Sequence, residues 1–212
     1  MIHATKFHIL TATLAVAIAA SGCSRKPGRV HPPSIKAASA GKSAIDLYDK
    51  DSDGELSRQE LAACPGILWA FAHYDKDSDG QVDADEIATR IRQWQTSRVG
   101  LMPFRCRVTL DGSPLAGATL KFVPESFLGQ SMKPAAGTSS AQGLVIPVVA
   151  AADLPADQQN LRGVQFGLYK IEVSHPGREL PEMYRNPSKL GCEITPDLIM
   201  QQPVFELSSR SP

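Results

Sequence analysis

Two stretches of the chain repeat one acidic pattern, and their residue types and spacing are suited to binding a metal ion. The first reads DKDSDGELSRQE (residues 49–60), and the second reads DKDSDGQVDADE (residues 75–86). In both, aspartate is first, third and fifth, glycine is sixth and glutamate is twelfth. Short carboxylates that alternate on a tight loop can converge on one point, and the glycine permits a turn that a Cβ would obstruct. Calcium takes about six to eight oxygen ligands, so each stretch is a candidate calcium loop.

Each loop also supplies the remaining oxygen ligands that calcium needs. Each stretch resembles the twelve-residue calcium loop of an EF-hand. In that loop the seventh residue contributes its backbone carbonyl, a water often intervenes at the ninth, and the twelfth can close the site with two carboxylate oxygens. The sequence therefore predicts two calcium sites. The candidate ligands are Asp49, Asp51, Asp53, Glu55, Ser57 and Glu60 in the first, and Asp75, Asp77, Asp79, Gln81, Asp83 and Glu86 in the second.

This pair of loops resembles an EF-hand pair, which implies a small all-α unit over residues 44–97. In that family paired loops usually meet in a short antiparallel bridge at the eighth position, here Leu56 and Val82. A dockerin-like module, in which duplicated calcium loops dock onto another protein, is the alternative within this unit. The entering helices and the glutamate at the twelfth position favour the EF-hand.

Apolar residues at helical spacing flank the loops. An entering helix of about two turns should end at Tyr48, and Ile87, Ile91 and Trp94 mark the last exiting helix. The loops begin 26 residues apart, so the helices between them, divided by Pro65 and Gly66, must be short. Residues 44–97 contain no methionine, which favours a shared apolar core over an exposed target-binding groove.

Residues 1–22 have the features of an export signal. The apolar run from Ile9 to Ala20 is shorter than the roughly 20 residues of a membrane-spanning helix. It ends in Ala-Ser-Gly-Cys, which resembles the lipobox of bacterial lipoproteins, although Ala20 stands where leucine is commonest. The resemblance implies lipid attachment at Cys23 and export to the periplasmic or cell-surface face of a bacterial membrane. Ordinary cleavage that leaves Cys23 free is the alternative.

Residues 23–43 contain proline, glycine, serine and lysine without an apolar period, which predicts a disordered tether. This segment has five basic residues and no acid, so an anionic membrane surface would attract it.

Formal charges balance over the whole chain, with 22 basic and 22 acidic residues, but they are segregated. Residues 44–97 carry twelve acids against five Lys and Arg, which is typical of a cation site. No basic face with interleaved aromatics indicates nucleic-acid binding. We find no glycine-rich phosphate loop, nucleophile elbow or paired Ser/His or Cys/His motif, and therefore predict no enzyme activity and identify no small-molecule substrate.

From residue 98 onward, short β-branched and aromatic runs alternate with Gly and Pro turns, which predicts an all-β sandwich for residues 98–212. The expected strands are residues 105–110, 119–124, 144–149, 167–174 and 204–208.

Three segments of this region resemble the carboxypeptidase-regulatory-like, or transthyretin-like, family. They are VTLDGSPLAGATLKFVPE (residues 108–125), GLYKIEV (167–173) and YRNPSKLG (184–191). The resemblance implies an immunoglobulin-like sandwich with a structural or adhesive role, of a kind that occurs in bacterial surface lipoproteins. Relatives that are hydrolases end in Tyr-Arg-Gly-Ser, whereas this chain ends in Ser-Ser-Arg-Ser-Pro, so their activity is not carried over.

Three cysteines remain besides Cys23, and an odd number cannot pair completely within one chain. Cys106 and Cys192 could form a disulfide in an oxidising compartment, or both could be buried thiols. The sequence leaves these alternatives open.

The sequence thus predicts a multidomain α + β protein with an EF-hand pair followed by a transthyretin-like sandwich. We expect a calcium-binding lipoprotein, anchored to a membrane through Cys23, whose sandwich does structural or protein-contact work in the cell envelope. The alternative is a calcium-regulated interaction module, either dockerin-like or a sensor.

Overall fold

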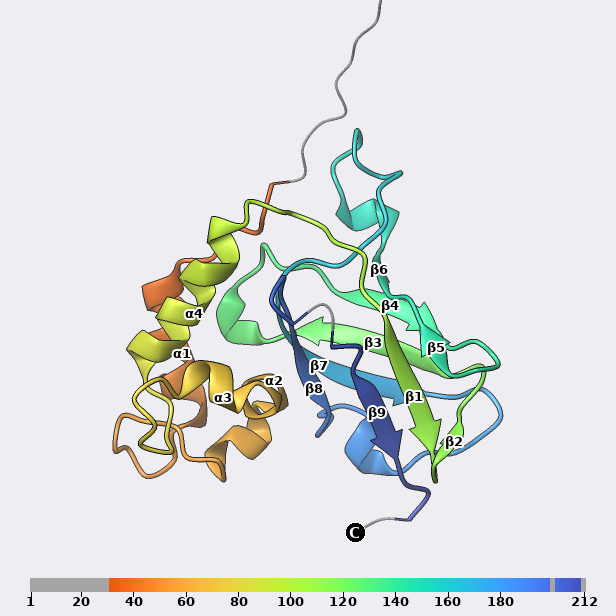
Figure 1. The fold of residues 1–212 in the computed structure, drawn as a ribbon, viewed down its shortest axis with the longest axis horizontal. Helices are drawn as coiled ribbons and strands as arrows, with labels where there is room; N and C mark the ends of the chain where they lie inside the picture. Colours follow the sequence, from red (N-terminus) through yellow and green to blue (C-terminus); the bar gives the residue numbers. More distant parts are fainter. Residues whose placement is uncertain (1–30, 199–200, 211–212) are drawn as a thin grey trace, which may run out of the picture.

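The computed structural model describes residues 31–198 and 201–210. Within these residues a helical region precedes a β-sheet region, and the two lie against each other (Figure 1). The predicted export signal and Cys23 lie outside the described residues.

Short helices build the helical region. They are α1 (Ala37–Tyr48), the 3-10 helix η1 (Glu60–Ala63), α2 (Pro65–Trp69), α3 (Phe71–Tyr74) and α4 (Ala84–Thr96). The helices between the loops are brief, as the loop spacing predicts. Pro65 begins α2 instead of ending the preceding helix, because the fixed φ of proline suits a first helical position.

In the described part of the chain, no helix is long and apolar enough to cross a membrane.

Helix α1 is longer than expected and begins at Ala37, inside the segment 23–43 that the sequence predicts as a disordered tether. That part of the prediction was wrong because α1 buries small residues, which give no strong apolar period. Gly41 and Ala44 are buried in α1. A Cβ added to Gly41 would lie 2.1 Å from the carbonyl oxygen of Ala84, so α1 and the start of α4 are in backbone contact.

Nine strands within the described residues form two sheets. They are β1 (Cys106–Leu110), β2 (Ser113–Pro114), β3 (Thr119–Pro124), β4 (Ala135–Thr138), β5 (Leu144–Val145), β6 (Val148–Val149), β7 (Gly167–Ser174), β8 (Gly191–Ile194) and β9 (Val204–Leu207). In one sheet β1 pairs antiparallel with β2 and β5 and parallel with β9. The other sheet has the antiparallel order β6-β4-β3-β7-β8. Three 3-10 helices join these strands: η2 (Ser126–Leu128), η3 (Ala151–Asp153) and η4 (Glu182–Tyr184).

Phe122 of β3 lies at the centre of the sheet region's core. Its ring centroid is 5.9 Å from that of Phe104, 6.1 Å from that of Tyr169 and 6.4 Å from that of Phe205, all in edge-to-face arrangements. Tyr169 lies on β7 of the same sheet, whereas Phe205 lies on β9 of the other sheet, so the contact between Phe122 and Phe205 joins the two sheets. Aromatic pairs of this geometry contribute about 0.5–1.5 kcal/mol each beyond the area that they bury.

The helical region covers one face of β7 and β8. Every residue of β8 is buried, although this strand is at the edge of its sheet. A Cβ added to Gly191 of β8 would lie 2.4 Å from the nitrogen of Gly66 and 2.5 Å from the carbonyl carbon of Pro65. The first turn of α2 therefore contacts β8 backbone to backbone, and the buried apolar residues of both regions form one cluster.

The close contact between α2 and β8 can be tested with Gly191→Ala. Because two backbones must separate to admit a methyl group, we expect the free energy of unfolding to fall by about 1–3 kcal/mol in chemical denaturation. Gly177→Ala is the matched control, since its added Cβ would meet nothing closer than the His175 ring at 3.6 Å. Equal losses in the two variants would contradict the close contact.

Candidate calcium sites

The two acidic loops have the same backbone conformation. Ser52 and Ser78, at the fourth position, have φ of 64° and 65°, and Gly54 and Gly80 both have φ of 92°. Glycine adopts this conformation without the steric penalty that a Cβ would add. The repeat in the sequence is therefore a repeat in the structure.

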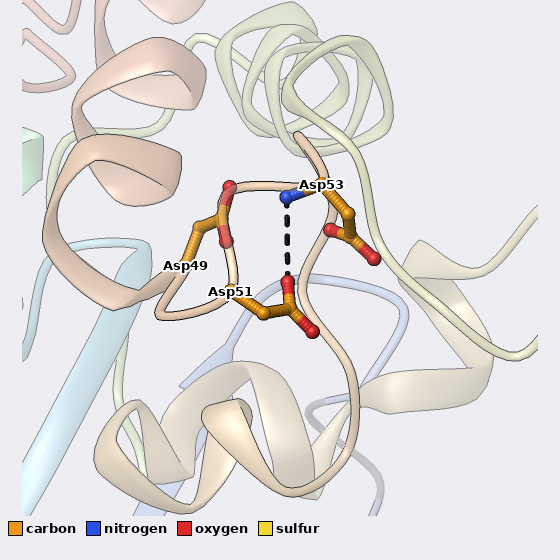
Figure 2. A group of neighbouring side chains, drawn as sticks. All are labelled: Asp49, Asp51 and Asp53. Carbon is orange, nitrogen blue, oxygen red and sulfur yellow. Dashed lines mark hydrogen bonds between the residues drawn. The ribbon is translucent and has the colours of Figure 1, made fainter.

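In the first loop, the three alternating aspartates lie around a single turn of the chain (Figure 2). One carboxylate oxygen from each of Asp49, Asp51 and Asp53 lies within 4.8 Å of the other two. Loop N–H groups hold these side chains: Ser52 donates to Asp49 at 2.6 Å, and Asp53 donates to Asp51 at 3.3 Å. The predicted ligands of this turn are thus brought together.

Glu60 closes the first loop from the start of η1. Its Oε1 accepts a hydrogen bond from the Lys50 N–H at 2.6 Å, and its Oε2 accepts from the Ser57 hydroxyl and N–H at 2.7 and 2.9 Å. These donors, the Lys50 N–H first, lower the pKa of Glu60 to about 2. Glu60 is therefore ionised at neutral pH, and the second and ninth residues of the loop, Lys50 and Ser57, hold its carboxylate in place.

The second loop also gathers three of its predicted ligands, and here the glutamate at the twelfth position is one of them. Oxygens of Asp75, Asp77 and Glu86 lie within 4.8 Å of one another. Glu86 accepts from the Lys76 N–H at 2.7 Å, as Glu60 does from Lys50. Glu86 and Asp83 also exchange hydrogen bonds between side chain and backbone, which makes a capping box at the start of α4.

Asp75 carries the observation that most directly indicates a bound cation. Its Oδ1 is buried and has no hydrogen-bond partner, and it is the single side-chain atom of this kind among the described residues. Leaving a buried polar atom unsatisfied costs about 1–3 kcal/mol, and more when the group is charged. Asp75 holds the first position of the second loop, so an ion coordinated there would satisfy the atom. The residues present therefore fit a calcium ion.

The carboxylates also repel one another. Burial, together with the charges of Asp79 and Asp53, raises the pKa of Glu55. For Asp51, a hydrogen bond from the Asp53 N–H lowers the pKa, but desolvation and the neighbouring carboxylates outweigh it and raise the pKa overall. A cation in each loop would relieve this repulsion.

The loops are joined to each other. Leu56 and Val82 exchange backbone hydrogen bonds of 2.9 and 3.1 Å, which confirms the predicted antiparallel bridge. Gln81 also donates from Nε2 to Glu55 Oε2 at 2.6 Å. The sequence analysis assigned only the backbone carbonyl of the seventh position a role. The structure adds a contact between the side chains of Glu55 and Gln81, which both lie beside the bridge.

Two buried hydrogen-bonded pairs beside the loops could not be found from the sequence. Tyr48 and Tyr74, the residues directly before each loop, hydrogen-bond to the buried carboxylates of Glu125 and Glu193 in the sheet region. The tyrosine directly before each loop is visible in the sequence as part of the repeat. Nothing in the sequence marks either glutamate as its partner.

The cysteines of the described residues are not bridged. Cys64, Cys106 and Cys192 are buried free thiols. Burial raises the pKa of Cys106 to about 12 and raises that of Cys192 as well. Both are therefore protonated at neutral pH, and the structure corresponds to the buried-thiol alternative.

The family model described as EF hand matches residues 42–65 and 70–89 of this chain. Each matched segment contains one complete acidic loop. No curated protein and no solved structure matches the chain. Residues 42–89 therefore carry an EF-hand region, followed by a β-sheet region, and the EF-hand supports calcium as the ion that the loops bind.

Each loop should depend on the glutamate at its twelfth position. Glu60→Gln and Glu86→Gln each remove a charged ligand, so we expect each variant to weaken one site by about tenfold or more, which corresponds to about 1.4 kcal/mol. Equilibrium dialysis against radioactive calcium measures the affinity and the number of ions bound by the full-length protein.

Asp46→Asn is the matched control, because it removes the same charge from an exposed position on α1. It should leave both sites unchanged. Wild-type affinity in both glutamine variants would contradict the assignment of Glu60 and Glu86 as ligands.

Proposed function

We propose that this protein is a calcium-binding lipoprotein of the cell envelope, in which two calcium ions brace the helical region against the sheet region. The observation that carries the proposal is the unpartnered Oδ1 of Asp75, buried among acidic side chains in an EF-hand loop. The same ligand pattern and backbone geometry in the first loop support a second site.

A bracing role is favoured over a regulatory one by the burial of the helical region's apolar side chains. Ile67, Phe71 and Trp94 are at most 5% exposed and belong to the cluster shared with the sheet region. Calcium sensors expose a methionine-rich groove when the ion binds, and residues 44–97 contain no methionine. The alternative, a calcium-regulated interaction module, would require this cluster to open.

We place the protein on the periplasmic or cell-surface face of a bacterial membrane, held by a lipid on Cys23. The sequence Ala-Ser-Gly-Cys after the apolar run supports this placement. Extracellular EF-hand modules bind calcium at roughly 10⁻⁴–10⁻³ M. At such affinities the ion would be bound for most of the protein's life outside the cytoplasm, which agrees with a structural role.

We further propose that the sheet region is a transthyretin-like sandwich that makes structural or protein contacts in the envelope. Its two sheets meet where Phe122 contacts Phe205. The family-like segment 108–125 includes the end of β1 and all of β2 and β3, and the segment 167–173 covers nearly all of β7. The proposal includes no catalytic activity.

Calcium should stabilise the folded protein. Without the ion the loop carboxylates repel one another, so the melting temperature should rise with calcium and fall with excess chelator. At a calcium concentration of 100 times Kd, each site adds about 2.7 kcal/mol to the free energy of unfolding. Differential scanning calorimetry measures the shift, and the double variant Glu60→Gln/Glu86→Gln should show little of it. A wild-type melting temperature that is insensitive to calcium would count against both sites.

The membrane anchor has its own test. Cys23→Ser removes the thiol that would carry the lipid, so the protein should stop incorporating radiolabelled fatty acid and should move from the membrane fraction to the soluble fraction. Calcium binding should be retained, because Cys23 lies far in sequence from both loops. A wild-type protein found wholly in the soluble fraction would rule out the anchor.

A further inference from the structure

Each calcium loop is preceded by a tyrosine that reaches into the sheet region. The Tyr48 hydroxyl donates to Glu125 Oε2 at 2.8 Å, and the Tyr74 hydroxyl donates to Glu193 Oε1 at 2.9 Å. The glutamates are each 1% exposed, and the tyrosines are 9% and 0% exposed. Glu125 follows β3 and Glu193 lies on β8, so equivalent residues of the helical repeat meet two separate parts of the sheet.

The carboxylate of Glu193 is satisfied from the helical region. Besides the Tyr74 hydroxyl, Trp94 Nε1 donates to it at 2.9 Å, and Arg90 Nε donates at 2.9 and 3.1 Å. Arg90 forms a buried ion pair with Glu193 and a second ion pair with Asp197. If the helical region moved away, Glu193 would lose these donors. Truncating one partner of a buried ion pair is strongly destabilising for the same reason.

Glu125 is held in part by its own region. Lys170 of β7 lies 3.4 Å from its Oε2 and donates to the Tyr48 hydroxyl oxygen at 3.2 Å. The helical region contributes the Tyr48 hydroxyl and, at 3.5 Å, the Cys64 thiol. Lys170 thus compensates the charge of Glu125, while Tyr48 links that charge to the first loop.

The tyrosines are placed where they can influence calcium binding. The next residue after Tyr48 is Asp49, and the next after Tyr74 is Asp75, each the first ligand of its loop. The N–H of Asp49 bonds to the Ile45 carbonyl at 2.9 Å, so this ligand is an extension of the entering helix. Fixing the tyrosine ring therefore fixes the position from which the first carboxylate enters the loop.

We propose that Tyr48 and Tyr74 are positioning residues for calcium, and that the sheet region, through Glu125 and Glu193, is the built-in partner of the EF-hand pair. This inference rests on the proposed calcium binding and adds the partner that raises its affinity. Because coupling between two binding events is reciprocal, calcium also strengthens the docking of the helical region on the sheet by the same factor.

Tyr48→Phe and Tyr74→Phe test the coupling, because each removes one hydroxyl and no calcium ligand. We expect each to raise a calcium Kd of the full-length protein by about fivefold or more, the lower end of ordinary coupling energies, in isothermal titration calorimetry. Tyr169→Phe is the matched control: Tyr169 is 0% exposed and donates to the Gln165 carbonyl at 2.9 Å, within the sheet region. It should leave both calcium affinities unchanged.

The assignment of each tyrosine to its own loop can be read in the Glu86→Gln background, where the first loop is the intact one. There Tyr48→Phe should weaken binding more than Tyr74→Phe does. The reverse order would overturn the pairing of tyrosine and loop.

The outcomes separate this inference from the proposed function. If the wild-type protein binds two ions and both Tyr→Phe variants bind them with wild-type affinity, the coupling is wrong and the proposed function stands. If Tyr169→Phe weakens binding as much as the others, the effect is one of general stability and the coupling is again wrong. A wild-type protein that binds no calcium would overturn the proposed function and this inference together.

A second measurement uses the wild-type protein, so it tests the coupling between calcium binding and the sheet region even if the variants fail to fold. Calcium should slow amide hydrogen exchange in β8 (Gly191–Ile194), which carries Glu193, more than in β1 (Cys106–Leu110), which lies in the other sheet. Equal protection of the two strands would overturn the coupling.

Discussion

Repulsion among the carboxylates of two short loops is the constraint on which this structure depends. Backbone N–H groups of the loops donate hydrogen bonds to some carboxylates, such as those of Asp49 and Glu60. The Oδ1 of Asp75, in contrast, is buried without a hydrogen-bond partner. A divalent cation would neutralise the carboxylate charge that the hydrogen-bond donors of the loop leave uncompensated. Because the loops bridge each other through Leu56 and Val82, an ion bound in one loop would also help to hold the bridging residue of the other.

The helical region that carries the loops shares one buried apolar cluster with the sheet region. Gly66 and Gly191 let α2 approach β8 to backbone contact, and that approach covers an edge strand that would otherwise be open to pairing with another chain. Buried glutamates at this boundary then require donors, and the tyrosines before the loops supply them. The position of the helices and the protection of the edge strand are therefore linked, and under our proposal calcium binding is linked to both.

Features encoded by local pattern were predictable from the sequence, and features that depend on distant contacts were not. The ligand spacing and the short middle helices follow from neighbouring residues, and the bridge follows from the resemblance to an EF-hand pair. Strand β8 escaped prediction because both of its faces are buried, so its sequence GCEI shows no alternation. The partners of Tyr48 and Tyr74 lie 77 and 119 residues away, and no local rule reaches that far. Helix α1 begins earlier than the sequence predicts, because its small residues are buried by packing against the distant helix α4 and leave no apolar pattern in the sequence.

Calorimetric titration of the full-length protein with calcium at several temperatures tests the central claim most directly. The account predicts two ions bound per chain and a negative heat-capacity change, because ordering the helical region on the sheet buries apolar surface. A titration in which no calcium binds would contradict the account. Binding of two ions with no change in heat capacity would show that the loops take up calcium without drawing the helical region onto the sheet.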